Sequence, residues 1–223
     1  MPALLIPNDW SVVVVGRWNR AILTPAGIGR RVFRVPPDTP LGVLIALDVI
    51  APPLVKHDNM TVVADNDRLT IQTSVCAFED LARACSLAAN ALRELPETPL
   101  TAVGFNVKYM ASDYVEAIDA VLASDLDDRA SDAGYRIRER QIHRSLEHNA
   151  GRINILAAVS DDGVRSVMLN FDLQSDSREQ HLDWLSQNAV SISTEVHKVL
   201  EKLFQIPAGD IEYEAADRIA DNS

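Results

Sequence analysis

Residues 153–173 read INILAAVSDDGVRSVMLNFDL, and this stretch decides the class of fold. Two apolar runs, 153–159 and 164–173, flank the turn-forming segment Ser-Asp-Asp-Gly, a pattern typical of an antiparallel β-hairpin. Every second residue of the later run is apolar, which predicts a strand with one buried face. These alternating residues are Val167, Leu169, Phe171 and Leu173.

The segment after this hairpin predicts a long amphipathic helix. Its apolar residues recur with the three-four spacing of one helix face, at Leu182, Leu185, Ala189, Ile192, Val196, Val199 and Leu203. Asp176 and Glu179 have the spacing of an N-terminal cap, and Pro207 lies beyond the expected end. We expect this helix to lie across the sheet. The alternative is that part of its apolar face contacts a second subunit.

Three segments in the middle of the chain also have clear patterns. Residues 60–73 indicate a second hairpin, and the apolar period that starts at Phe78 indicates a helix that ends before Pro96. Residues 100–109 alternate as a strand. Gly104 within this strand indicates a bulge or the close approach of another backbone.

Another helix and a loop are expected after this strand. Residues 112–122 indicate a helix with Asp113 and Glu116 in capping-box spacing, followed by an acidic loop at 125–128.

The N-terminal region adds three expected strands. Residues 11–18 are β-branched and apolar, typical of a strand buried on both faces, and residues 31–35 indicate an edge strand. Residues 41–50 predict a buried strand, with a short helix as the alternative.

These elements predict an α+β protein whose antiparallel sheet carries about three helices on one face. A strand, an asparagine and a Ser-Asp-x-x-Glu helix start occur twice, around Asn106 and around Asn170. Two similar halves would explain this repetition, and so would two independent helix caps. We expect either two domains, 1–110 with proline-rich strands, hairpin, helix and strand and 111–223 with helix, hairpin and long helix, or one domain.

The composition indicates a folded, acidic protein. The chain has 21 basic and 32 acidic residues, a net charge of −11, and 47% hydrophobic residues, which excludes global disorder. The negative charge disfavours nucleic-acid binding over the whole surface but leaves room for a local basic patch. Residues 1–60 hold six basic and four acidic residues and eight of the eleven prolines.

The sequence contains no pattern of export or membrane insertion. The start, MPALLIPNDW, lacks a basic region, and prolines interrupt its apolar run. No apolar run approaches the roughly 20 residues that span a bilayer. We expect a cytoplasmic protein with no membrane segment, in which Cys85 is a buried apolar side chain.

The histidines do not have the spacing of a metal site. His143 and His148 are five residues apart, which separates their side chains on a helix and on a strand alike. His181 and His197 flank the apolar face of the last helix, and we expect both to face solvent.

Motifs for nucleophilic catalysis and for phosphate binding are also missing. No G-x-S-x-G occurs. Gly27 and Gly29 form a G-x-G pair without the third glycine or the Lys-Ser/Thr of a phosphate-binding loop. We therefore expect no cofactor, no metal and no catalytic residue visible in the sequence.

A row of arginines is the sharpest candidate for binding. In an extended segment Arg136, Arg138 and Arg140 would project from one face about 6–7 Å apart. Such a row suits phosphates or carboxylates, and Arg30 and Arg31 could add to it. The competing interpretation is pairing with acidic residues of this same protein.

Two phrases of the sequence resemble a group of uncharacterised bacterial proteins. They are LPxTPLxAVGFN at 95–106 and WNxAIxTP at 18–25. The resemblance implies a bacterial or phage origin, and it implies no function or catalytic residue.

The sequence therefore favours a non-enzymatic protein-interaction or assembly subunit of a bacterial or phage system, with a protein partner or self-association. One alternative is a nucleic-acid-associated subunit that uses the arginine row. The other is an enzyme whose reactive residues converge only in the fold.

Overall fold

The computed structural model describes residues 5–46, 51–111 and 115–211. The strands are β1 (Ile6–Pro7), β2 (Ser11–Gly16), β3 (Gly42–Leu44), β4 (Leu54–His57), β5 (Met60–Ala64), β6 (Arg68–Thr73), β7 (Leu100–Ala111), β8 (Arg140–His148), β9 (Gly151–Val159) and β10 (Arg165–Gln174). The helices are α1 (Pro25–Ile28), η1 (Gly29–Phe33), α2 (Phe78–Glu94), α3 (Glu116–Leu122), α4 (Asp125–Asp132), α5 (Arg178–Phe204) and η2 (Ala208–Asp210).

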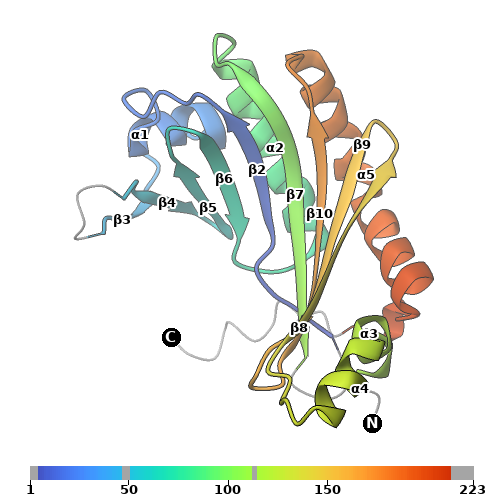
Figure 1. Ribbon diagram of the computed structural model, residues 1–223. Helices are drawn as coiled ribbons and strands as arrows, with labels where there is room; N and C mark the ends of the chain where they lie inside the picture. Colours follow the sequence, from blue (N-terminus) through green and yellow to red (C-terminus); the bar gives the residue numbers. More distant parts are fainter. Residues whose placement is uncertain (1–4, 47–50, 112–114, 212–223) are drawn as a thin grey trace.

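The described strands form one antiparallel sheet that runs through the molecule (Figure 1). Its order is β3-β4-β5-β6-β2-β7-β10-β9-β8, and the short β1 pairs with the far end of β7. β2 and β7 form the centre, so that β7 joins the N-terminal strands to the C-terminal hairpin. The chain is therefore an α+β protein with a continuous sheet.

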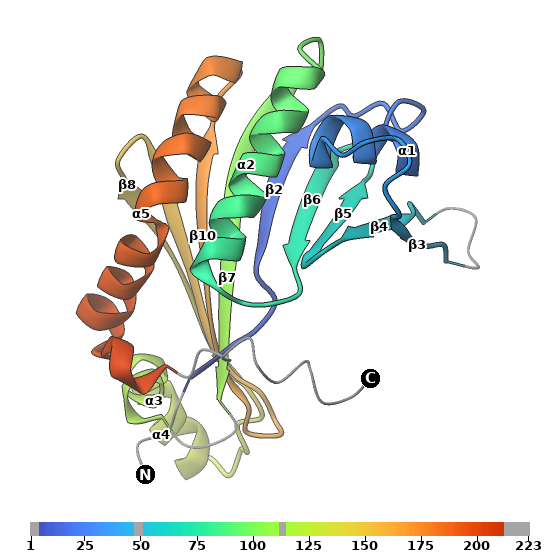
Figure 2. The same cartoon turned by 180° about the vertical axis from the view of Figure 1, so that it is seen from behind.

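Helices α2 and α5 lie side by side on one face of this sheet (Figure 2). Their apolar sides and the alternate strand residues form one core. Phe105 of β7 stacks on Phe171 of β10 with ring centroids 4.6 Å apart, and Trp184 of α5 packs against Phe105. α3 packs against α5 and the ends of β8 and β9, and adds Ile118 and Leu122 to the same core.

The order of elements repeats along the chain. β2 leads through α1 and η1 to the meander β4-β5-β6 and then to α2, whereas β7 leads through α3 and α4 to the meander β8-β9-β10 and then to α5. From the centre of the sheet outward the strands are β2-β6-β5-β4 on one side and β7-β10-β9-β8 on the other. The two runs are thus arranged about the central pair as in a two-fold dimer, and the second run begins with β7.

Arg178 connects the two long helices. Its guanidinium donates hydrogen bonds to the backbone carbonyls of Leu92 (2.9 Å), Leu95 (3.1 Å) and Thr98 (3.0 Å). The last carbonyls of a helix have no partner within it and carry partial negative charge. A side chain at the start of α5 therefore caps the end of α2.

The strongest sequence patterns form the expected elements. The hairpins β5–β6 and β9–β10 and the helices α2 and α5 confirm the predictions. Of the two alternatives for Gly104, the close approach holds, because a Cβ there would lie 2.6 Å from the carbonyl oxygen of Phe171. The apolar face of α5 packs against this same chain, with Leu182 and Ala189 partly buried and Leu203 46% exposed.

Three N-terminal expectations are wrong. β2 is central, but the helices cover only one of its faces, and Val15 on the other face is exposed. Residues 31–35 do not form a strand: 31–33 belong to the π-helical turn η1, and Arg34, with a left-handed backbone, ends it. Residues 41–50 do not form a buried strand: Gly42–Leu44 is the exposed strand β3, the outermost of the described strands, and residues 47–50 lie outside the described residues.

Three expected details at helix starts also differ. The acidic segment 125–128 begins α4 instead of forming a loop, because Ser124 Oγ accepts the Leu126 N–H and the aspartates favour a helix N-terminus. α3 starts at Glu116, and its expected cap Asp113 lies outside the described residues. α5 is capped by Ser177, whose Oγ accepts the Gln180 N–H, and not by Asp176.

Candidate binding face

The second face of the sheet is open. In Figure 1 no described helix crosses in front of β5, β6, β2, β7 and β10, while α2 lies behind them. Strand residues alternate in direction, so the residues between the core positions of each strand point to this open side. On β7 these include Asn106 and Lys108, which are half-buried, between the buried Phe105, Val107 and Tyr109.

A continuous row of polar residues crosses this open face. Each member is paired in register with the next, from β4 to β8, and the row consists of Lys56, Thr61, Gln72, Ser11, Asn106, Asn170, Asn154 and Ser145. The seven steps between neighbouring strands give it a length of about 34 Å. The row is centred on the β2–β7 pair, with four residues from each of the two repeated runs.

The C-terminal part of the row is a hydrogen-bonded chain. Ser145 Oγ donates to Asn154 Oδ1 (2.8 Å) and Asn154 Nδ2 donates to Asn170 Oδ1 (2.8 Å). Asn170 Nδ2 then donates to Asn106 Oδ1 (2.8 Å), and Asn106 Nδ2 donates to Ser11 Oγ (3.2 Å). All four bonds run in the same direction, so the amides are fixed in orientation across five strands.

An ion pair supports this chain on one side. Arg152 Nη2 lies 2.9 Å from Asp172 Oδ2, and Asp172 Oδ1 accepts a second hydrogen bond from Asn154. The hydrogen bond from Arg152 to Asp172 and the negative charge of Asp172 raise the pKa of the Arg152 guanidinium above its usual value. Gly104, paired with Asp172, lets the backbones of β7 and β10 approach closely at this point.

A hollow lies beside the N-terminal part of the row. It has a volume of about 550 Å³ and is lined by Ile6, Pro7, Asn8, Asp9, Lys56, Thr61, Gln72, Thr73, Ser74 and Cys76. The lining includes the row residues Lys56, Thr61 and Gln72 and the loop from β1 to β2. Asp9 in this loop accepts a 2.8 Å hydrogen bond from Gln72 Nε2.

The predicted arginine row does not form a strand face. Only Arg140 belongs to β8, and its Nε lies 2.6 Å from Asp127 Oδ2, while Arg136 pairs with Asp161 at 3.7 Å. Arg138 is exposed in the segment between α4 and β8. Internal ion pairs thus engage two of these three side chains.

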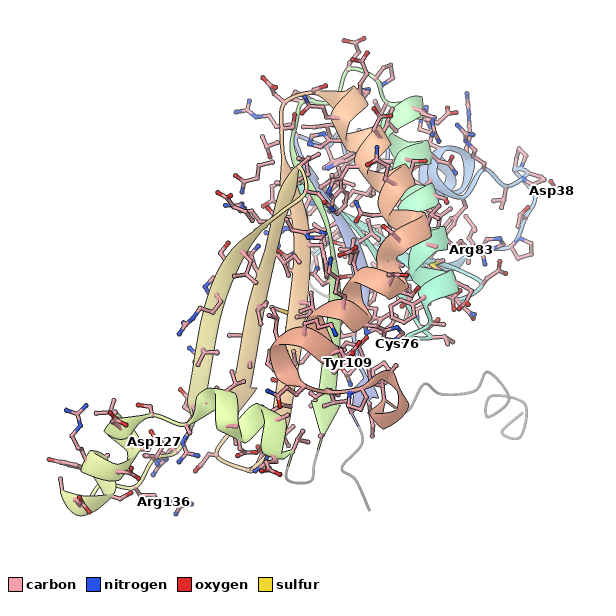
Figure 3. All side chains as sticks on the ribbon, turned by 90° about the vertical axis from the view of Figure 1, so that its right-hand side faces the viewer. Asp38, Cys76, Arg83, Tyr109, Asp127 and Arg136 are labelled. Atoms are coloured by element: carbon pink, nitrogen blue, oxygen red, sulfur yellow. The ribbon has the colours of Figure 1, made fainter. Side chains whose placement is uncertain are left out.

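The other two predicted arginines lie elsewhere. Arg30 and Arg31 are in η1, next to α2. Figure 3 shows Arg136 and Asp127 at one corner of the molecule and Asp38, which follows η1 along the chain, at the opposite side. The fold therefore does not bring the two arginine groups together.

The part of the chain that is described contains no group of side chains suited to holding a metal ion. No three His, Cys, Asp or Glu side chains converge as metal ligands, and no helix there is long and apolar enough to cross a membrane. His181 was expected to face solvent but is fully buried, with no hydrogen-bond partner among the described residues for either ring nitrogen. It lies away from the polar row, on α5.

Sequence reasoning singled out Asn106 and Asn170 as a repeated pattern but did not place them in a site. Their signal was an asparagine between two core residues of a strand, a position where asparagine is uncommon. No family model matches the chain, and no curated protein matches it. The geometry of the open face is therefore the basis for a function.

Proposed function

We propose that this protein is a non-enzymatic interaction subunit that binds a protein partner with the open face of its sheet. The observation that carries the proposal is the hydrogen-bonded row from Ser145 to Ser11 on a face left free by the described helices. Fixed amides present donors and acceptors without further loss of side-chain entropy on binding, which favours recognition.

The chemistry of the face supports a protein partner. Side-chain amides and hydroxyls match the hydrogen-bonding groups of polypeptides, and the net charge of −11 repels polyanions at long range. The polar row also disfavours burial against a second apolar sheet, because each amide without a partner would cost free energy. An assembly subunit of a bacterial or phage system, with self-association included, fits this surface.

Replacement of two central amides tests the proposal. The double variant Asn154→Ala/Asn170→Ala removes the middle of the row, whereas Gln187→Ala changes an exposed residue on α5, on the helix side. Tagged proteins would be cross-linked in native lysate and the bound proteins quantified by mass spectrometry. We expect partners recovered with wild-type protein and Gln187→Ala to be depleted with the double variant, while thermal unfolding shows that all three are folded.

Sedimentation velocity measures the oligomeric state, and its result can contradict the proposal. A wild-type protein that sediments as a monomer, together with no partner whose recovery depends on Asn154 and Asn170, would contradict the proposal. If self-association is the function, the double variant should shift the wild-type oligomer toward monomer.

A further inference from the structure

The two halves of the polar row differ in how their groups are satisfied. From Ser145 to Ser11 each side chain is hydrogen-bonded to its neighbour in the row. In the other half, Lys56 and Thr61 make no side-chain hydrogen bond or ion pair within the described ranges. Both side chains line the hollow of about 550 Å³, so a ligand can satisfy them.

The hollow has opposite charges at its two ends. Lys56 is on β4, and Gln72 is two strands away on β6, about 10 Å from it at the backbone. Gln72 Nε2 donates a hydrogen bond to Oδ1 of Asp9, so the other carboxylate oxygen of Asp9 can accept a hydrogen bond from a ligand. The ammonium and the carboxylate therefore flank a stretch of hydroxyl and amide groups.

The loop that carries Asp9 is held rigidly. The Asn8 N–H and the Trp10 indole N–H both donate to the Lys108 carbonyl, at 2.7 and 3.1 Å. Between these anchors Asp9 adopts a left-handed conformation with φ of 58°, which is unfavourable for most residues other than glycine and is tolerated by Asp and Asn. The fold thus fixes the Asp9 carboxylate at the wall of the hollow.

From this geometry we propose that the hollow binds a small zwitterion of dipeptide size. The ligand carboxylate lies against Lys56 and its ammonium lies against Asp9. Two extended residues span about 7 Å, and with a charge-assisted hydrogen bond of about 2.8 Å at each end such a ligand is long enough to reach across the roughly 10 Å between Lys56 and Gln72, which binds Asp9. Ile6, Pro7 and Cys76 supply an apolar wall for the ligand side chains.

Other ligand classes fit this hollow less well. A simple anion would meet Asp9, and a simple cation would meet Lys56, so each would gain one charge contact and suffer one repulsion. A divalent metal ion would find one carboxylate in the lining, fewer than such ions require. The zwitterion is the class that uses both charges, and its binding does not depend on a protein partner at the row.

Calorimetric titration of the full chain tests this inference. The probes are unmodified dipeptides with small, branched and aromatic side chains (Gly-Gly, Ala-Ala, Leu-Leu and Ala-Phe), each compared with its N-acetylated and its C-amidated form. The variants are Lys56→Met and Asp9→Asn, since asparagine also tolerates the left-handed conformation. Lys108→Met, on the same face but outside the lining, is the matched control.

We expect at least one unmodified dipeptide to bind saturably and each capped form to bind at least about tenfold more weakly, as for the loss of a hydrogen bond to a charged group. Lys56→Met should abolish the difference between free and amidated carboxyl ends, Asp9→Asn should abolish the difference between free and acetylated amino ends, and Lys108→Met should change neither. Absence of saturable binding by all four unmodified dipeptides would overturn the inference, as would equal binding of capped and free forms.

Discussion

The side-chain nitrogen of Asn170 donates a 2.8 Å hydrogen bond to the side-chain oxygen of Asn106, 64 residues away in the sequence. The two asparagines are paired in register on β10 and β7, the first two strands of the second repeated run, counted outward from the centre of the sheet. Their contact links the fold to the candidate binding face, because the same register that buries Phe105 against Phe171 brings the amides together.

A double-mutant cycle measures this link. Asn106→Ala and Asn170→Ala should each lower the free energy of unfolding by about 1 kcal/mol, with a coupling of about 0.5–1 kcal/mol between them. Urea denaturation of the two single variants, the double variant and wild type provides the values. Purely additive effects would mean that the hydrogen bond between the two amides contributes nothing to stability in solution.

Gly104→Ala should destabilise the protein by about 1–3 kcal/mol, as expected for overpacking. The new Cβ would lie 2.6 Å from the Phe171 carbonyl oxygen and 3.2 Å from Asp172 Cβ. Gly209→Ala is the control, since no atom of the described residues lies within 4 Å of its Cβ position. Thermal unfolding should show a large loss for the first variant and little change for the second, and equal values would refute the close approach.

Arg178→Met should cost about 2–3 kcal/mol of stability, because three carbonyls, one in the last turn of α2 and two just beyond its end, lose a charged donor. Amide hydrogen exchange should increase in residues 91–98 before it increases elsewhere. Arg93→Met removes a nearby exposed arginine from the last turn of α2 and should have a small effect. A similar loss of stability in both variants would argue against the cap.

Stability should decrease as the pH falls below about 6.5, and His181 should contribute to this decrease. Burial, and then the charge of Arg178, lower the pKa of His181 from its usual 6.5, while Asp176 opposes the change. The unfolded chain takes up a proton below pH 6.5 whereas the folded chain does not, so the slope reaches at most about 1.4 kcal/mol per pH unit.

The variant His181→Leu should reduce this pH dependence and leave stability at pH 8 similar or higher, since both ring nitrogens of His181 are buried without partners in the described chain. His143→Gln, on the exposed strand β8, shows the effect of losing a histidine as such. Urea unfolding between pH 5 and pH 8 is the measurement. An unchanged slope in His181→Leu would show that other groups cause the dependence.

The two cysteines should differ in reactivity. Burial raises the pKa of the Cys85 thiol to about 12, so the reactive thiolate is scarce at neutral pH. Cys76 lines the hollow and is only partly buried. Iodoacetamide followed by peptide mass spectrometry should label Cys76 in the folded protein and Cys85 only after unfolding; equal labelling of both in the folded state would be the contrary result.

Several elements could be predicted because their signals are local. The alternation from Val167 to Leu173 and the period from Leu182 to Val199 each report one buried face, and β10 and α5 follow them. One error came from tertiary position and another from a local helix cap. Residues 42–44 are apolar yet exposed, because β3 is an outer strand, and the acidic segment at 125–128 is helical because Ser124 caps it.

The residues of the candidate site were also hard to predict from local sequence patterns. Arginines 136, 138 and 140 were noticed because their spacing is visible along the chain, but Asp127 and Asp161 engage two of them. Asn106 and Asn170 were noticed as a repeated pattern, whereas Asn154, Ser145 and Ser11 were not. A row across a sheet takes one residue from each strand, so it has no period in the sequence.

The amino-acid sequence by itself determined the strongly periodic elements, such as β10, α2 and α5, and which side of each is apolar, because alternation and helical period are properties of neighbouring residues. Only the tertiary structure decided the order and register of the strands. That register depends on long-range pairing, and it aligns eight polar residues from distant segments into one row with a hollow beside it.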